Sequence, residues 1–131
     1  MTKITKDEPY KIAVIEDDAA IRDLYGLKLS LSGFEVRTAR DGLEGLKLVE
    51  AFAPDLILLD IRMPYMNGDE MLQRVREQEW GASIRVIILT NISRDEAPSI
   101  LRFLRTDRYI VKAHYTPAQV VEIVQETLHI K

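Results

Sequence analysis

The sequence predicts an α/β fold in which a parallel sheet of five strands lies between two layers of helices. Short apolar runs of strand length alternate along the chain with longer segments whose apolar residues recur at helical spacing. Five such strand–helix units fit within 131 residues, a length typical of one domain with a sizeable core. Residues 1–10 are polar and are expected to form an arm, so the domain would occupy residues 11–131.

Five apolar segments are expected to form the strands. Several of them are almost continuously apolar, as strands buried on both faces of a parallel sheet are. The expected strands are 11–15, 34–38, 56–59, 84–89 and 108–111.

The first three helices have recognisable ends. The first is expected at 19–32, because Gly33 is a typical residue just beyond a helix end. The second begins after Asp41, which forms a possible capping box with Glu44. The third is expected to begin near Asn67 and to end by Gly81.

The last two helices are predicted from apolar spacing and from proline positions. One carries Ile100, Leu101 and Leu104, with Pro98 in its first turn because proline is tolerated there and not in a helix interior. The other begins with a capping sequence in which the cap, first and third positions are Thr116, Pro117 and Gln119.

Polar residues close four of the apolar runs. Parallel strands bring their carboxyl ends to one edge of the sheet, so these residues are expected to converge. Three carboxylates favour a divalent cation, and a hydroxyl with an ammonium group favours an anion beside it. The residues are Glu16, Asp17, Asp60, Thr90 and Lys112.

Composition excludes several classes of function. The 18 basic and 21 acidic residues give a net charge of −3, so nucleic-acid binding is not expected. The absence of cysteine excludes a disulfide framework and a cysteine-based zinc site. No apolar run has the length of a signal peptide core or a membrane span, so we expect a cytoplasmic protein that does not contact a membrane.

The order of these residues resembles the receiver domain of bacterial two-component response regulators. The resemblance covers about residues 10–130 and implies a flavodoxin-like (βα)5 three-layer sandwich with strand order 2-1-3-4-5. Each matching segment is short, but all of them occur in order and most stand at the end of a predicted strand. The matching segments are Val14-Ile15-Glu16-Asp17-Asp18, Leu58-Leu59-Asp60-Ile61-Arg62-Met63-Pro64, Asn67-Gly68, Leu89-Thr90 and Tyr109-Ile110-Val111-Lys112.

The resemblance implies a phosphoacceptor and a metal site. Asp60 would be the nucleophile that forms an aspartyl phosphate. Glu16, Asp17 and Asp60, with the backbone carbonyl of Arg62, would hold Mg²⁺, with Mn²⁺ able to substitute.

Three further roles follow from the same resemblance. Thr90 and Lys112 would bind the phosphoryl oxygens during transfer. Tyr109 would act with Thr90 as a conformational switch. Arg62 and Ile92 would flank the path of attacking water and, being cationic and apolar, would make self-dephosphorylation slow.

The implied function is that of a stand-alone response regulator. Its donor would be a sensor histidine kinase or a histidine phosphotransfer protein. Its downstream protein partner would bind the face made by the helix around residues 100–104, the strand 108–111 and the last helix. Such a protein is not an enzyme, although it promotes its own Mg²⁺-dependent phosphorylation and slow dephosphorylation.

Two alternatives to this function stay open. The first is an unphosphorylated protein-interaction module on the same fold. The second is a phosphatase with an aspartate nucleophile, which is less favoured because Glu16-Asp17-Asp18 lacks the D-x-D motif of such enzymes. A flavin-binding protein is disfavoured because no Ser/Thr/Gly-rich loop follows the first strand.

Three residues depart from the family pattern. Ala113 replaces the usual proline after the lysine, so a trans peptide bond and a reshaped turn are expected. Arg105 and Thr106 replace a small glycine–alanine pair before the last strand. We therefore expect an unusual connection near the predicted output face.

Overall fold

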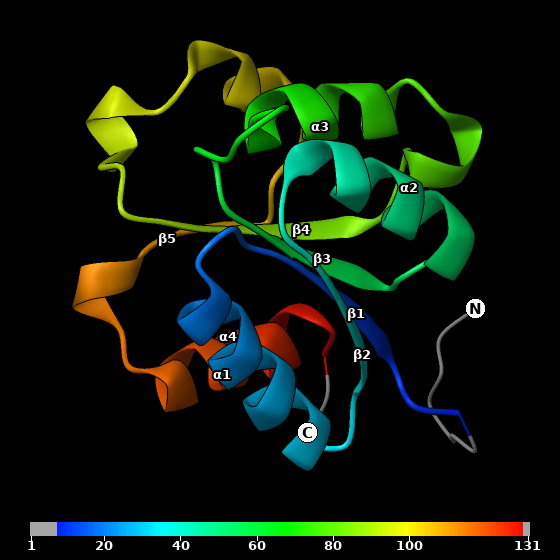
Figure 1. Ribbon diagram of the computed structural model, residues 1–131, viewed down its shortest axis with the longest axis vertical. Helices are drawn as coiled ribbons and strands as arrows, with labels where there is room; N and C mark the ends of the chain where they lie inside the picture. The colour runs from blue at the N-terminus through cyan, green and yellow to red at the C-terminus, as the bar shows by residue number, and fades with distance from the viewer. Residues whose placement is uncertain (1–7, 130–131) are drawn as a thin grey trace.

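The parallel sheet lies between two pairs of helices in a computed structural model that describes residues 8–129. The helices α1 and α4 cover one face of the sheet, and α2 and α3 cover the other (Figure 1). The strand order β2-β1-β3-β4-β5 confirms the predicted topology. The strands are β1 (Lys11–Ile15), β2 (Glu35–Ala39), β3 (Leu56–Leu59), β4 (Arg85–Thr90) and β5 (Arg108–Val111), and the α-helices are α1 (Ala19–Leu31), α2 (Gly42–Phe52), α3 (Gly68–Arg76) and α4 (Pro117–Thr127).

Residues 1–7 of the predicted N-terminal arm lie outside the described residues. Within the described range, no helix has both the length and the apolar character needed to cross a membrane.

The central strand β3 is buried on both faces of the sheet. Ile57 and Leu59 pack into the apolar cluster beneath α2 and α3. Leu56 and Leu58 pack into the cluster beneath α1 and α4. All four side chains are at most 1% exposed, as the continuous apolar run predicts. This double burial holds the strand in place just before Asp60.

The predicted helix caps are present with one change of partner. At α4, Gln119 N donates to Thr116 Oγ1 (3.1 Å) and Thr116 N donates to Gln119 Oε1 (2.8 Å), which confirms the capping box. At α2, Glu44 N donates to Asp41 Oδ1 (2.7 Å), but the Glu44 side chain accepts from Arg40 N instead of Asp41 N. Both helices therefore start where the sequence predicts.

The helix predicted around residues 100–104 is not an α-helix. Two short 3-10 helices, Arg94–Glu96 and Ser99–Phe103, take its place. Pro98 stands just before the second of them, and Arg105 follows with a positive φ of 54°. Pro98 prevents a helix from continuing through it from the preceding residues. The left-handed conformation of Arg105 ends the helical segment after Leu104. Fewer than two turns can therefore form between them.

Arg76 fixes the connection that follows this segment. From the end of α3, its guanidinium donates to the carbonyl oxygens of Gly81 (2.8 Å), Leu104 (2.8 Å) and Arg105 (2.7 Å). The guanidinium therefore joins the end of the 3-10 segment to the 3-10 helix Glu79–Gly81, in which Trp80 is 38% exposed. The connection at Arg105 is thus unusual, as the sequence led us to expect, and Arg76 holds it in place.

The turn after β5 also has the expected form. Residues Lys112–His114 form a 3-10 turn, and no cis peptide bond occurs in the described part of the chain. The peptide bond before Ala113 is therefore trans, as predicted.

We expect Arg76→Lys to lower the free energy of unfolding by about 2–4 kcal/mol, because lysine cannot reach three carbonyls in one plane. Denaturant unfolding measures the change. The matched control is Arg74→Lys in the same helix, whose exposed ion pair with Glu70 should make it worth less than about 0.5 kcal/mol. Equal effects of the two substitutions would show that the three hydrogen bonds do not stabilise the connection.

Candidate functional site

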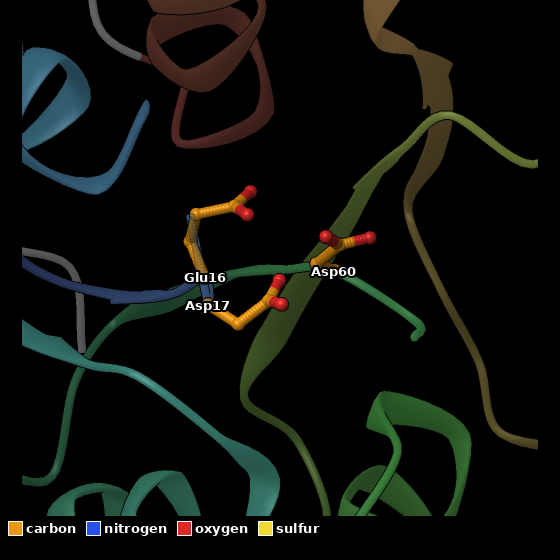
Figure 2. Close-up of side chains that lie close together, drawn as sticks. All are labelled: Glu16, Asp17 and Asp60. Atoms are coloured by element: carbon orange, nitrogen blue, oxygen red, sulfur yellow. The ribbon is translucent and has the colours of Figure 1, made fainter. Parts of the chain in front are cut away.

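The ends of β1 and β3 bring the acidic residues together. These strands are paired in parallel with Ile15 opposite Leu59, so the residue after each strand lies at the same edge of the sheet. Asp60 N donates to the carbonyl oxygen of Ile15 (3.1 Å), which ties the two strand ends to each other. Figure 2 shows the three carboxylates of Glu16, Asp17 and Asp60 grouped at this edge.

These three carboxylates form a cluster that could hold a metal ion. Each offers one oxygen, and the three oxygens lie within 4.8 Å of one another. Glu16 is 3% exposed and Asp60 7%, whereas Asp17 is exposed to solvent. Hard oxygen donors with an open side suit a divalent cation that keeps several waters.

Lys112 supplies a positive charge to the two buried acids. Its Nζ lies 2.7 Å from Glu16 Oε1 and 3.2 Å from Asp60 Oδ2. The other Asp60 oxygen, Oδ1, accepts from Ile61 N at 2.7 Å. The sequence placed Lys112 at this edge, and the structure shows that its ammonium bridges Glu16 and Asp60.

The pKa values of Glu16 and Lys112 reflect this arrangement. Burial raises the pKa of the Glu16 carboxyl, and the charge of Asp60 adds to the rise, although Lys112 and the Asp18 amide oppose it. Burial alone would lower the pKa of Lys112, but its hydrogen bond to Glu16 and the charges of both acids outweigh burial and raise it. Lys112 therefore stays charged beside two acids that repel each other.

Thr90 and Tyr109 both contact the residue Ile92. Thr90 is 1% exposed at the end of β4, and its Oγ1 accepts from Ile92 N at 3.4 Å. Tyr109 donates its hydroxyl hydrogen to the carbonyl oxygens of Ile92 (2.7 Å) and Ser93 (3.3 Å). The Arg94 guanidinium lies 5.3 Å from the centre of the Tyr109 ring. The two predicted switch residues are thus linked through the backbone of one residue, Ile92, whose amide contacts Thr90 and whose carbonyl contacts Tyr109.

The two residues predicted to slow hydrolysis differ in their burial. Arg62 is exposed in the loop after Asp60. Ile92 is half-buried and packs against the apolar cluster beneath α2 and α3. Their effect on hydrolysis stays a prediction.

Two residues to which the sequence analysis gave no role also lie at the site. Gly68 N donates to the carbonyl oxygen of Ile61 (2.6 Å), and a Cβ at Gly68 would stand 1.9 Å from the carbonyl oxygen of Asp60. Arg22, on α1, donates to the backbone carbonyls of Glu16 and Asp17. The glycine could have been suspected from its place in the motif, whereas no pattern in the sequence indicates the contacts of Arg22.

The family model for the response regulator receiver domain matches residues 12–125. The chain belongs to this family. Among solved structures, a receiver domain protein (CheY-like) from Methanospirillum hungatei JF-1 superimposes on this receiver domain with a TM-score of 0.85. The two are 29% identical, and the match covers 93% of this chain and 95% of the other. The match agrees with the predicted flavodoxin-like fold.

Curated relatives of the receiver domain are longer proteins. The DNA-binding dual master transcriptional regulator RpaA of Synechocystis is 39% identical over 84 residues, which is 64% of this chain and 35% of that protein. The probable transcriptional regulator ycf27 of Guillardia theta is 36% identical over 103 residues, which is 78% of this chain and 39% of that protein. The chain thus spans about a third of the length of the first of these relatives.

We expect Lys112→Met to destabilise the metal-free receiver domain by about 3 kcal/mol at neutral pH, because two buried carboxylates lose their counter-ion. The raised pKa of Glu16 sets the pH dependence. The folded state binds that proton more tightly than the unfolded chain, so stability is lost as pH rises above the ordinary value of 4.5 and through the folded pKa. Lys112 opposes this rise, so its loss raises the pKa of Glu16 further, and Lys112→Met gains more stability than the wild type as pH falls from neutral toward 4.5. The deficit of Lys112→Met should therefore shrink over that range.

Denaturant unfolding with a chelator present, over this pH range, measures the deficit. The control is Lys47→Met, an exposed lysine on α2. A deficit that is independent of pH, or equal to that of the control, would contradict this electrostatic account.

Proposed function

We propose that Asp60 accepts a phosphoryl group from a phosphohistidine of a sensor histidine kinase or histidine phosphotransfer protein. The observation that carries this proposal is the contact of Lys112 Nζ with both Glu16 and Asp60 at the edge of the sheet. This contact joins the Lys112 ammonium to two buried carboxylates, and the exposed carboxylate of Asp17 lies beside them. Phosphoryl transfer needs such positioning and charge compensation more than it needs covalent chemistry from the protein.

Mg²⁺ is the metal that suits this receiver domain, with Mn²⁺ as a substitute. Glu16, Asp17 and Asp60 would hold it, together with the backbone carbonyl of Arg62. When bound, the metal would neutralise charge that develops on the phosphoryl oxygens. The grouping of three carboxylate oxygens supports this assignment, because hard oxygen ligands are those that Mg²⁺ and Mn²⁺ prefer.

The transfer step follows from the chemistry of the chain's own residues. An Asp60 oxygen attacks phosphorus, the bond from phosphorus to the donor imidazole breaks, and the imidazole nitrogen keeps the electron pair and then takes up a proton. Lys112 moves its hydrogen bond from Asp60 to a phosphoryl oxygen, and the Thr90 hydroxyl donates to another. In this role the protein is an acceptor that turns over only by slow hydrolysis of its own aspartyl phosphate.

The same hydroxyl connects the site to an output face. If Thr90 turns toward the phosphoryl group, its Oγ1 releases Ile92 N, and the Ile92 carbonyl that holds Tyr109 moves with it. The face made by residues 91–104, β5 and α4 would then bind a downstream protein. The 76% exposure of Phe103 on this face supports a protein partner.

DNA binding is named for a longer relative and is not proposed for this domain. The absence of nucleic-acid contacts here stays a prediction from the net charge of −3. The stand-alone character of the chain likewise stays a prediction.

The acceptor is tested by intact-mass measurement after incubation with Mg²⁺ and acetyl phosphate. We expect one added phosphoryl group on the wild type and none on Asp60→Asn, because an amide is a much poorer nucleophile than a carboxylate. Beryllofluoride binding in the presence of Mg²⁺ tests the same site without phosphoryl transfer.

Stoichiometric labelling of Asp60→Asn would overturn the assignment of the acceptor. A wild type that takes up neither label nor beryllofluoride would favour the unphosphorylated interaction module. Turnover of an aryl phosphate would favour the phosphatase.

The lifetime of the phosphorylated state is tested by the double variant Arg62→Asn with Ile92→Glu. We expect it to lose the phosphoryl group about tenfold faster than the wild type, a barrier change of about 1.4 kcal/mol, because the small polar pair admits and orients water. Decay of phosphoprotein after donor removal, at constant Mg²⁺, measures the rate. The two single variants show which position contributes. Decay of the double variant at the wild-type rate would mean that hydrolysis is controlled elsewhere.

A further inference from the structure

Arg22 contacts the backbone on both sides of Asp17. It is the fourth residue of α1, and its Nη1 donates to the carbonyl oxygens of Glu16 (2.9 Å) and Asp17 (3.3 Å). Its own backbone N donates to the carbonyl oxygen of Asp18 (2.9 Å). One residue of the helix therefore binds three successive peptide carbonyls of the loop that carries the acids.

Electrostatics alone does not favour a positive charge at the start of α1. The first turn of a helix carries a partial positive charge, so an arginine there is mildly repelled. The guanidinium also adds positive charge beside a cluster proposed to bind a metal cation. Its position is explained by the two carbonyls that it satisfies, which lie beyond the end of β1 and receive no strand partner.

The other contacts of this loop hold its amide groups. Glu16 N donates to the carbonyl oxygen of Ala39 (3.0 Å), which is the last bond on that side of β1. Asp18 N donates to Glu16 Oε2 (3.1 Å), and the Asp18 side chain caps α1 by accepting from Ile21 N (3.1 Å). Arg22 adds the complementary contacts to the carbonyl oxygens.

These contacts together determine the direction of the Asp17 side chain. The peptide plane before Asp17 carries the Glu16 carbonyl, and the plane after it carries the Asp17 carbonyl. Fixing both planes fixes φ and ψ of Asp17 and hence the direction of its Cβ. Because Asp17 is exposed, packing does not hold its side chain in place.

We propose that Arg22 is a positioning residue that orients Asp17 for binding the divalent cation. This inference rests on the proposed function, because it assumes that the acidic cluster holds Mg²⁺. Arg22 does not touch the cation and repels it slightly through its charge. Its favourable contribution comes from preorganising a ligand, as outer hydrogen-bond partners of metal ligands do.

The two effects of Arg22 on metal affinity have opposite signs. Loss of the charge alone would strengthen Mg²⁺ binding, because one repulsion disappears. Loss of the two hydrogen bonds would weaken it, because Asp17 must then be ordered when the metal binds. We expect the second effect to dominate, so that Arg22→Gln raises the Mg²⁺ dissociation constant about tenfold. Arg22→Lys keeps the charge but has a shorter side chain without the planar guanidinium, so its dissociation constant should also rise, by a smaller factor.

Calorimetric titration of MgCl₂ into the metal-free protein measures the dissociation constants. The matched control is Lys28→Gln, which removes the same charge from an exposed position further along α1. Asp17→Asn shows the effect of losing the ligand itself. Circular dichroism and denaturant unfolding establish that each variant is folded at the titration temperature. If Arg22→Gln does not fold, the Mg²⁺ dissociation constant of Arg22→Lys tests the inference.

A second readout separates positioning from general damage. The rate of labelling by acetyl phosphate should fall in Arg22→Gln at limiting Mg²⁺ and return to the wild-type rate at saturating Mg²⁺. A folded Arg22 variant with unchanged or tighter Mg²⁺ binding would overturn the inference, as would a labelling rate that stays low at saturation. A wild type that binds Mg²⁺ but takes no label would contradict the proposed acceptor function alone. A wild type that does not bind Mg²⁺ would overturn both.

Discussion

The register between β1 and β3 is the constraint on which the rest of the site depends. Ile15 pairs with Leu59, so Glu16 and Asp60 leave the sheet side by side. A slip of one residue would turn the side chains of β3 from one apolar cluster toward the other, and both clusters are closely packed around that strand. The repulsion between the acids is therefore opposed by the burial of the strands that precede them.

Much of this arrangement could be predicted from the sequence because it depends on near neighbours or on topology. The capping box of Thr116 and Gln119 is a local pattern, and the convergence of strand ends follows from a parallel sheet. The contacts of Lys112, Arg76 and Arg22 could not be predicted. Each of these long side chains contacts carboxylates or backbone carbonyls in another segment of the chain. Which groups it contacts depends on side-chain rotamers and packing, which the sequence pattern does not show.

The segment 91–104 shows where apolar spacing misleads. Leu101 and Leu104 are buried as a helix would bury them, yet the backbone forms short 3-10 turns. Pro98 removes a donor at one end, and Arg76 takes the carbonyls of Leu104 and Arg105 at the other. The apolar spacing thus reflects side-chain burial and not the hydrogen bonds of an α-helix. The segment contacts the site through Ile92.

The place of Trp80 has a practical consequence for spectroscopy. It is the single tryptophan of the chain and lies in the 3-10 helix before β4, whereas the acids follow the ends of β1 and β3. In a parallel sheet these are opposite edges. Its indole emission should therefore report the loss of folded structure around Gly81 and be largely silent when the acidic edge changes its occupancy. Fluorescence can then follow unfolding in the same cuvette in which a separate probe follows the ligand.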